Sequence, residues 1–510
     1  MNRFTLCAST LLSCAKHMQV HAVLPKMPKS GRISSPFRAR PLLPLISCLL
    51  LTGGVIRGYT QDAPKQDAPK TDKAVAKQPQ PLQVARLQDA PKTDAPKTDT
   101  SKQDAPKQDA TKEVTKPAVA QAPAAPAPTP PGTLTYSGLV DVYYAINARA
   151  PHSAGSLFSP AYTGILTPSG EKIRIDNAGR SFDINDRDLG FSLGEFNITR
   201  TEGKGFPVGF TATLTVGDTA RLVHATEPGG TSSWQTIQQL YVTKTLPIKN
   251  HDIAFDAGIF VTPFGYEVIE SSSNDNYSRS FGFQYGVPFY HAGFRATLPL
   301  TPKLQLLGAL VNGWNNIADD NDGKSALVQL TWKPGSQFTG IFGFMGGSEG
   351  TGAYGPGLAP KDKAGLNTYL YEFEPIYQVN AKLKLAGDVI YGNAAGHTIV
   401  GGGGQGHVSG DWVGLAGYLR YQLTPRLAFA GRLEQFEDIP GAGGAGLRLG
   451  IPGYAKLSST TGTLEYTFLR SHLLTRLEYR HDHSNAAFFG ASSNAVREQD
   501  TVTASAVYKF

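Results

Sequence analysis

Cysteine and long apolar runs are both scarce in this chain, and each absence excludes a class of protein. The only cysteines are Cys7, Cys14 and Cys48, all near the start of the 510-residue chain. The rest of the chain therefore has no disulfide framework and no thiolate metal site. Beyond the N-terminal region no run of 18 or more apolar residues occurs, which argues against membrane-spanning helices.

Positive charge is concentrated in one part of the chain. The net charge is +7, but residues 1–131 hold the whole basic excess, and residues 132–510 are slightly acidic. A nucleic-acid-binding domain would need a basic patch on a folded surface. We therefore expect no nucleic-acid partner.

Two segments precede the expected folded domain. Several arginines precede an apolar run at 42–55, the pattern of an export signal, so residues 1–60 are assigned to targeting. Residues 61–131 repeat QDAPK and TDAPK and end in a run of Pro and Ala. This composition buries too little apolar surface to fold, and we expect a disordered linker. The linker is either a plain spacer or a tether that contacts peptidoglycan or another partner.

From Thr133 onward, apolar and polar residues alternate with a period of two. In one segment, Leu427 and Leu433 belong to the apolar set, and Arg432 and Glu434 belong to the polar set. This pattern is typical of a strand with one apolar face and one polar face. Sixteen segments of about ten residues show it, starting near residues 133, 188, 207, 235, 250, 287, 303, 324, 337, 365, 381, 411, 426, 459, 471 and 498.

Long and short connections alternate between these segments. Short turns on one rim and long loops on the other are typical of transmembrane β-barrels. A soluble sandwich would bury the charged face in a small core at prohibitive cost, whereas a wide barrel turns that face to water. The sequence predicts an all-β fold, a transmembrane antiparallel up-and-down barrel of about 16 strands over residues 132–510. The long loops are expected at about 148–187, 218–234, 263–286, 313–323, 346–364, 392–410, 437–458 and 482–497.

The C-terminus carries a further sign of outer-membrane assembly. The chain ends in an aromatic residue, with apolar residues at alternate positions before it, and Tyr508 and Phe510 are the last two members of this series. The pattern resembles the signal by which the barrel-assembly machinery recognises outer-membrane proteins. We expect that machinery and outer-membrane lipid as partners.

Several stretches also carry a family resemblance. They read GIFVTPFGYE from Gly258, NYSRS from Asn276, PFYHAGFRAT from Pro288 and VNGWN from Val311. Together they resemble the β-barrel porin family, the OmpL-like group of bacterial outer-membrane proteins. The resemblance implies a porin-type barrel in the bacterial outer membrane and says little about the solute.

Motifs of catalysis and metal binding are not found. The chain has no His-Glu-x-x-His, no phosphate-binding loop and no nucleophile elbow. The acidic run 319–323 is interpreted as a solvated loop, and the glycine-rich run 401–406 is placed in a long loop with no helix after it. His481 and His483 are interpreted as solvent-facing. We therefore expect no enzyme activity, no cofactor and no metal site.

A barrel of this size is wide enough to leave an aqueous channel. The predicted function is an outer-membrane porin for passive diffusion of small hydrophilic solutes or ions. The alternative is a structural or adhesive barrel with a plugged lumen, tethered through its N-terminal repeats. A homotrimer is one assembly left open. By strand phase, the expected inward residues are Asp141, Asp256, His291, Arg295, Lys382, Lys384, Asp388, Arg420, Arg432, Glu434, Arg476, Glu478 and Arg480.

The loop at 263–286 is expected to fold into the lumen, as the third long loop does in general porins. We predict that its charged residues Glu267, Glu270, Asp275 and Arg279 form one side of a constriction. Wall arginines would form the other side, and opposed charges would create a field that selects solutes. These arginines are Arg432, Arg476 and Arg480. The alternative is that the wall charges pair across strands and stiffen the barrel.

Overall fold

The computed structural model describes residues 131–148, 165–166, 172–173, 175–228, 230–349, 365–400, 404–469, 472–489 and 495–510. The predicted targeting segment, residues 1–60, and all but the last residue of the predicted linker lie outside the described residues.

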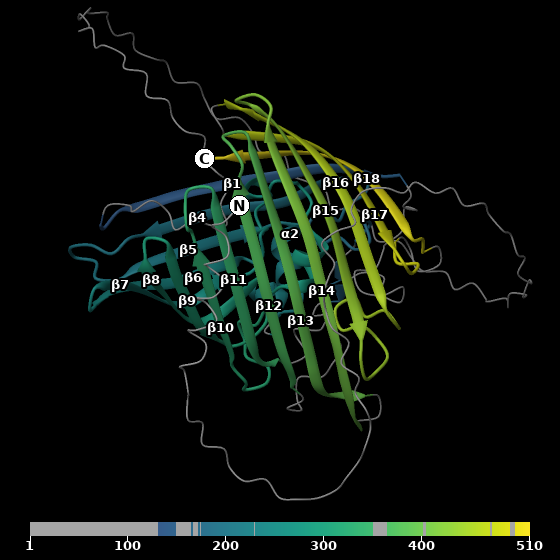
Figure 1. Cartoon of the computed structure of the whole chain (residues 1–510), viewed down its shortest axis with the longest axis horizontal. Helices are drawn as coiled ribbons and strands as arrows, with labels where there is room; N and C mark the ends of the chain where they lie inside the picture. The colour runs from purple at the N-terminus through teal and green to yellow at the C-terminus, as the bar shows by residue number, and fades with distance from the viewer. Residues whose placement is uncertain are drawn as a thin grey trace, which may run out of the picture. The chain divides into compact units, whose positions relative to one another are not determined.

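Sixteen antiparallel strands close into one barrel within the described part of the chain (Figure 1). Each strand pairs with its neighbours along the sequence, and β1 pairs with β18 to complete the ring. Closure leaves no unpaired edge, which a sheet in lipid requires. The strands are β1 (Leu134–Asn147), β4 (Leu189–Arg200), β5 (Gly209–Val216), β6 (Ile237–Ile248), β7 (His251–Val261), β8 (Tyr290–Thr301), β9 (Leu304–Val311), β10 (Ser325–Trp332), β11 (Phe338–Glu349), β12 (Leu366–Gln378), β13 (Leu383–Val400), β14 (Gly404–Gln422), β15 (Leu427–Pro440), β16 (Ala455–Phe468), β17 (Leu473–Ser484) and β18 (Glu498–Lys509).

The remaining described elements are short and lie in the long loops. A hairpin of β2 (Ile165–Leu166) and β3 (Lys172–Ile173) follows β1. Helices α2 (Asp218–Val223) and α3 (Thr231–Trp234) follow β5, and the turns η1 (Ser271–Ser273) and η2 (Gly282–Gly286) follow β7. None of the described helices is long and apolar enough to span a membrane.

The predicted alternation of long and short connections is confirmed except between β13 and β14, where the predicted long loop is wrong. The chain between 392 and 410 was expected to be a loop, but β13 runs to Val400 and β14 starts at Gly404. His397 and His407 are paired in this extension. Glycines carry no side chain, so the run around 401–406 shows no apolar phase, and the sequence pattern stopped short of the strand ends.

The two faces of each strand differ sharply in exposure. Leu433 is 58% exposed, whereas its neighbour Arg432 is 1% exposed. The first side chain points to the outside of the barrel and the second to its interior. The predicted phase is therefore confirmed at this strand, with apolar side chains outside and charged ones inside.

The buried apolar core lies inside the barrel, where loops meet the wall. Phe281 and Phe283 belong to the loop 262–289, and Trp412 belongs to the inner face of β14. The indole of Trp412 donates a hydrogen bond to the carbonyl of Gly286, 3.0 Å away. Loop and wall are thus packed together as one unit.

Candidate pore constriction

The loop 262–289 crosses the barrel interior. It leaves β7 and returns to β8, yet several of its contacts lie on strands far around the ring. The backbone N–H of Gly265 donates to Glu372 on β12 at 2.8 Å, and that of Tyr277 donates to Glu478 on β17 at 2.6 Å. The predicted entry of this loop into the lumen agrees with these contacts.

A glycine on the wall makes close approach possible. A Cβ at Gly343 would lie 2.5 Å from the ring of Phe264. Any side chain at this position would therefore push the start of the loop away from β11. The loop and the inner wall fit together because this position of the wall has no side chain.

An ion pair joins the loop to β15, and further ion pairs join β15 to β17. Glu267 contacts Arg432 at 2.6 Å, with side chains 2% and 0% exposed. Arg432 also contacts Glu434 at 3.1 Å, and Arg480 contacts the same Glu434 at 3.3 Å. Acid and base alternate along this chain of contacts, so each buried charge has an opposite neighbour. Buried ions persist only when they are paired in this way.

Wall carboxylates also accept the loop's backbone N–H groups. Glu478 accepts from Tyr277 and Ser278 at 2.6 and 3.0 Å, and Glu434 accepts from Phe281. Each bond satisfies a backbone donor that would otherwise be buried without a partner. Hydrogen bonds to charged groups contribute about 1.5–3 kcal/mol each. These contacts fix the loop against the wall.

Arg476 holds the loop from its carbonyl side. It donates to the carbonyls of Ser271 and Asn274, both at 2.6 Å. It also contacts Glu465 at 2.8 Å, and Glu465 contacts Arg420 at 2.5 Å. Arg476 therefore acts on the loop through backbone oxygens rather than through an opposite charge.

The other predicted loop residues have separate partners. Asp275 accepts from Tyr266 at 2.6 Å and contacts Lys384 at 2.9 Å. Glu270 is half-buried and accepts from Gln238 at 2.5 Å. Burial, together with the nearby Asp275, holds the pKa of the Tyr266 phenol well above its usual value.

Arg279 binds backbone carbonyls and an aromatic ring instead of pairing with the acidic residues with which it was grouped. Its guanidinium donates to the carbonyls of Tyr277 and Ile269 and lies 4.3 Å from the ring centre of Phe182. Burial lowers the pKa of Arg279, although the nearby Asp141 opposes that shift. Its role in the structure is to hold the loop's own backbone.

The structure brings the predicted charges together but not in the predicted way. We expected loop acids and wall arginines to face each other across a gap, whereas Glu267 and Arg432 are in direct contact and buried. The two sides attract, and neither could keep its charge unpaired at low dielectric. The alternative of pairing that stiffens the barrel describes this contact better. Selection of solutes by these residues stays a prediction.

Sequence reasoning missed a second buried network. Arg180 contacts Asp183 at 2.5 Å and Asp482 at 2.6 Å. Burial lowers the pKa of Arg180, but the two carboxylates outweigh it and raise the net value. Asp482 continues the inward series of β17 and could have been found from its phase. Arg180 lies in a loop without periodicity, so no sequence signal points to it.

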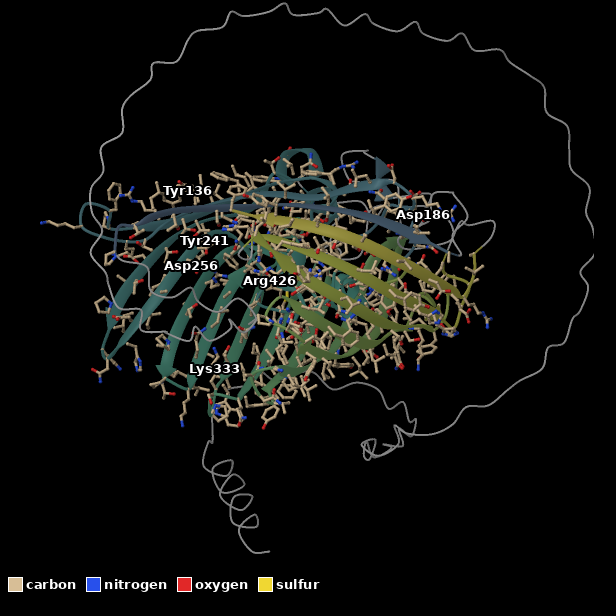
Figure 2. The ribbon with its side chains drawn as sticks, turned by 90° about the horizontal axis from the view of Figure 1, so that it is seen from above. Tyr136, Asp186, Tyr241, Asp256, Lys333 and Arg426 are labelled. Carbon is tan, nitrogen blue, oxygen red and sulfur yellow. The ribbon has the colours of Figure 1, made fainter. Side chains whose placement is uncertain are left out.

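The inner wall of β4–β10 is different in composition. Among the described residues, its only ion pair with both partners on the wall joins Arg295 and Asp256 at 2.9 Å, with side chains 15% and 10% exposed. Arg295 also lies 4.4 Å from the ring centre of Phe260. Figure 2 labels Tyr241 and Asp256 on these strands. Apart from Glu195, most other polar residues there are uncharged and half-buried, and they include Asn197, Thr199, Thr211, Gln239, Thr243, Thr245, Thr297, Gln305, Gln329 and Thr331.

The terminal aromatic residues point outward. Tyr508 is 46% exposed and Phe510 is 51% exposed, with ring centres 6.4 Å apart. Their position on the lipid side is the one an assembly signal requires, and that role stays a prediction. In the described ranges, no group of three or more His, Cys, Asp or Glu side chains could hold a metal ion.

A closed barrel with an apolar exterior, a charged interior and a loop folded across it defines a porin of the bacterial outer membrane. The family model described as beta-barrel porin-2, OmpL-like, matches residues 133–510. The chain belongs to this family. The family resemblance seen in the sequence is thereby confirmed.

Solved structures resemble the fold at low sequence identity. The outer membrane channel DcaP of Acinetobacter baumannii is 12% identical, with a TM-score of 0.45 over 74% of this chain and 98% of that one. An anion-selective porin from Comamonas acidovorans is 10% identical, with a TM-score of 0.45 over 74% and 100%. The trimer form of OmpT from Vibrio cholerae is 10% identical, with a TM-score of 0.46 over 75% and 100%. Among curated protein sequences, none matches this chain.

Proposed function

We propose that small hydrophilic solutes cross this porin passively along the inner wall of β4–β10, beside the docked loop 262–289. The proposal rests on the polar side chains that line this wall, which are mostly uncharged and half-buried. Hydroxyl and amide groups both donate and accept hydrogen bonds, so they can replace water around a solute. The charged residues of the opposite wall bind the loop instead. The chain performs no catalysis and needs no cofactor in this proposal.

In this proposal the constriction residues hold the loop 262–289 in position. Glu267, Asp275, Arg432, Arg476 and Arg480 fix how far the loop extends toward β4–β10, and so set the width left for solutes. The remaining members of the predicted set belong to the loop or to its side of the wall, except Arg295, which lies on the β4–β10 wall. They are Glu270, Arg279, Arg295, Arg420, Glu434 and Glu478.

Single-channel recording in planar bilayers tests the loop. The double variant Glu267→Gln, Glu270→Gln removes two negative charges from it. If the loop charges filter ions, the cation-to-anion permeability ratio falls. An unchanged ratio with an altered conductance means that the loop sets width only. Unchanged values of both would exclude the loop from the permeation path.

A second candidate function follows from the packed interior. Phe281, Phe283 and Trp412 are buried between loop and wall, which is what a plugged structural or adhesive barrel requires. Refolded protein in planar bilayers separates the two functions. A channel gives discrete conductance steps, whereas a plugged barrel inserts without conductance.

Assembly and tethering belong to the same proposal. We include a homotrimer, because OmpT of Vibrio cholerae is described in a trimer form. The linker 61–131 would span the periplasm and contact peptidoglycan. Cross-linking in intact cells, followed by mass spectrometry of the linker peptides, tests that contact.

A further inference from the structure

The short turns of the barrel carry a ring of positive charge. Among the described residues, six of the seven turns hold one lysine or arginine each, and the seventh holds His472. The only acidic residue in the described part of these turns is Glu202, which contacts Lys244 at 2.7 Å. The long loops, where the structure describes them, contain more acidic than basic residues. We name the six residues the turn cations, and they are Lys204, Lys249, Lys303, Lys333, Lys382 and Arg426.

The turn cations are not neutralised within the described part of the chain. Five of them are exposed and Lys333 is half-buried, and none forms an ion pair with another described residue. Two of them are neighbours, because the backbone N–H of Lys333 donates to the carbonyl of Lys303 at 2.7 Å. Figure 2 labels Lys333 at this rim. Adjacent like charges repel each other unless an anion lies between them. This pair of lysines therefore points to an anionic partner outside the chain.

Aromatic side chains indicate the depth of the turn cations in the membrane. Tryptophan and tyrosine are enriched at the level of the lipid headgroups. Trp332 is 43% exposed and directly precedes Lys333. The exposed Tyr377 and Tyr421 are the last residues but one of β12 and β14. The turns thus begin where the aromatic belt ends, at the level of the phosphates. Short turns of outer-membrane barrels face the periplasm, so these phosphates belong to the inner leaflet.

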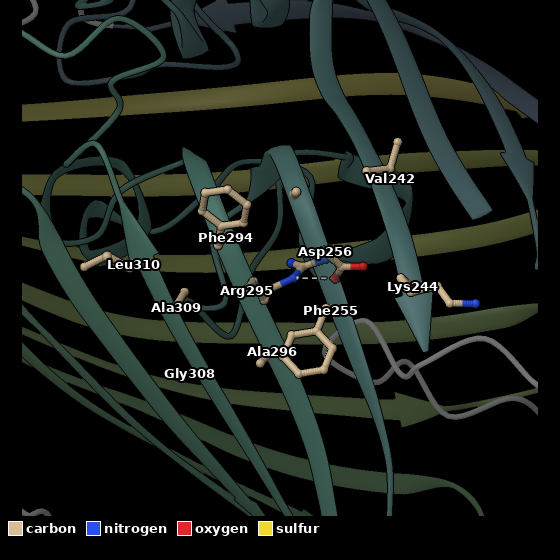
Figure 3. A pocket seen from close by; sticks show the side chains of 11 residues that line it. Val242, Lys244, Phe255, Asp256, Phe294, Arg295, Ala296, Gly308, Ala309 and Leu310 are labelled. Carbon is tan, nitrogen blue, oxygen red and sulfur yellow. Dashed lines mark hydrogen bonds and ion pairs between the residues drawn. The ribbon is translucent and has the colours of Figure 1, made fainter. Parts of the chain in front are cut away.

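A groove on the outer wall lies over the strands that two of these turns join. It has a volume of about 410 Å³ over β6–β9 (Figure 3), and its lining includes the small residues Ala257, Ala296 and Gly308. The turns from β6 to β7 and from β8 to β9 hold Lys249 and Lys303. Gly308 lies five residues beyond Lys303, which is roughly 17 Å of strand. A strand tilted in the bilayer covers less depth than its length, so the groove lies in the half of the hydrocarbon layer next to these lysines.

We infer that the turn cations bind anionic phospholipids of the inner leaflet. The phosphate lies beside Lys303 and Lys333, and one acyl chain occupies the groove. A zwitterionic phospholipid has no net charge to balance the two lysines, whereas an anionic one does. Each cation near an anionic membrane surface favours binding by about fivefold.

The distribution of the turn cations favours lipid over a polymer such as peptidoglycan. The cations are spread over successive turns instead of being gathered in one patch, and lipids surround a barrel in the same way. The groove adds an apolar site beside the charges, which a sugar polymer would leave empty. The inference rests on the outer-membrane barrel and is independent of its solute.

Quenching of Trp332 by brominated phospholipids tests the site in the full-length protein. Trp332 is exposed beside Lys333, whereas Trp314 and Trp412 are buried. In vesicles that mix brominated and unbrominated lipids, the quenching gives the affinity for phosphatidylglycerol relative to phosphatidylcholine. We expect a preference of about fivefold or more for phosphatidylglycerol at low salt, and a smaller one at about 1 M salt. The variant Trp332→Phe defines the background from the other tryptophans.

Two double variants separate the turn cations from charge in general. Lys303→Gln with Lys333→Gln should lower the preference to about onefold, because both neighbouring cations are lost. Lys324→Gln with Lys456→Gln removes two charges at the long-loop rim and should keep the wild-type preference. Heat-modifiable migration on gels verifies that each variant forms a folded barrel.

Two glycines make a matched test of the groove. Gly308→Phe fills it and should reduce the affinity for phosphatidylglycerol. Gly417→Phe adds the same side chain to the outward side of β14, where a Cβ also meets nothing, and should change nothing. Equal affinities in the two variants would exclude the acyl chain from the groove.

A wild type without lipid preference would overturn the inference. A preference that survives loss of Lys303 and Lys333, or that falls equally in the long-loop control, would overturn it too. Cosedimentation with purified peptidoglycan that depends on the two lysines, without any lipid preference, would assign the rim to peptidoglycan instead. A protein without lipid preference that still conducts would leave the proposed channel function intact.

Discussion

On β12–β17 many of the inward polar side chains are charged and buried, and several of them bind loop 262–289 through its backbone and through Glu267. On β4–β10 the inward polar side chains are mostly Thr, Gln and Asn, and most of them stay half-buried. The same closed sheet thus has one half that holds the loop and one half left for water. Charge inside a barrel does not by itself identify the solute path, because buried charges are used first to satisfy one another.

The largest effect is expected from Arg432→Met, which breaks the loop-holding half. Glu267 and Glu434 would lose their shared partner in a buried position, at a cost of about 3–5 kcal/mol. The urea midpoint of the barrel in micelles should fall, and single-channel conductance should rise or become noisy as the loop detaches.

Arg295→Met is the matched change on the other half. Its pair with Asp256 has side chains 15% and 10% exposed and includes no loop residue, so the loss of stability should be smaller than that caused by Arg432→Met. If Arg432→Met and Arg295→Met destabilised the barrel equally, the proposed difference between its two halves would be contradicted.

A second effect concerns the loop 217–236, where His224 stacks on Tyr290 with ring centres 4.6 Å apart. Burial lowers the pKa of His224 to about 4. The neutral imidazole contributes full stability above the unfolded value near 6.5, and this is lost as the pH falls toward 4, by about 3 kcal/mol at the limit. The hydrogen-exchange protection factors of this loop, corrected for the intrinsic rate at each pH, should fall from pH 7 to pH 5. His224→Phe should abolish the pH dependence, and a wild-type loop equally protected at both values would contradict it.

The variant Asp256→Asn tests the proposed solute path along β4–β10 rather than the stability of the barrel. It leaves Arg295 as a positive charge on the β4–β10 wall, so permeability should shift toward anions. We expect a change of a few-fold in the permeability ratio, measured as the reversal potential across a salt gradient. An unmoved reversal potential would place the path elsewhere.

Thr331→Val should have the smallest effect. The side chain is half-buried on the inner wall, and such substitutions usually stay within about 0.5 kcal/mol. Conductance should be unchanged within error. A marked loss of stability here would mean that the β4–β10 wall is packed like its counterpart.

The sequence predicted which side chains of each strand point inward, because this depends on the alternation of polar and apolar neighbours. Arg432, Glu434 and Glu478 alternate with apolar neighbours, and the structure turns them inward as predicted. The pairing of Glu267 with Arg432 was not readable, because the two residues are 165 positions apart and no period links them. Arg180 was missed for the same reason. The sequence did not predict the extension of β13 and β14, because a run of glycines shows no alternation of apolar and polar side chains.

The sequence alone determined the strands, the alternation of turns and loops, and the apolar exterior, since each follows from the period-two pattern of neighbouring residues. Tertiary structure alone decided which charges are consumed in holding the loop and which polar side chains stay open to water. That outcome depends on where one loop crosses a closed ring, and contact across the ring is set by geometry in space rather than by distance along the chain.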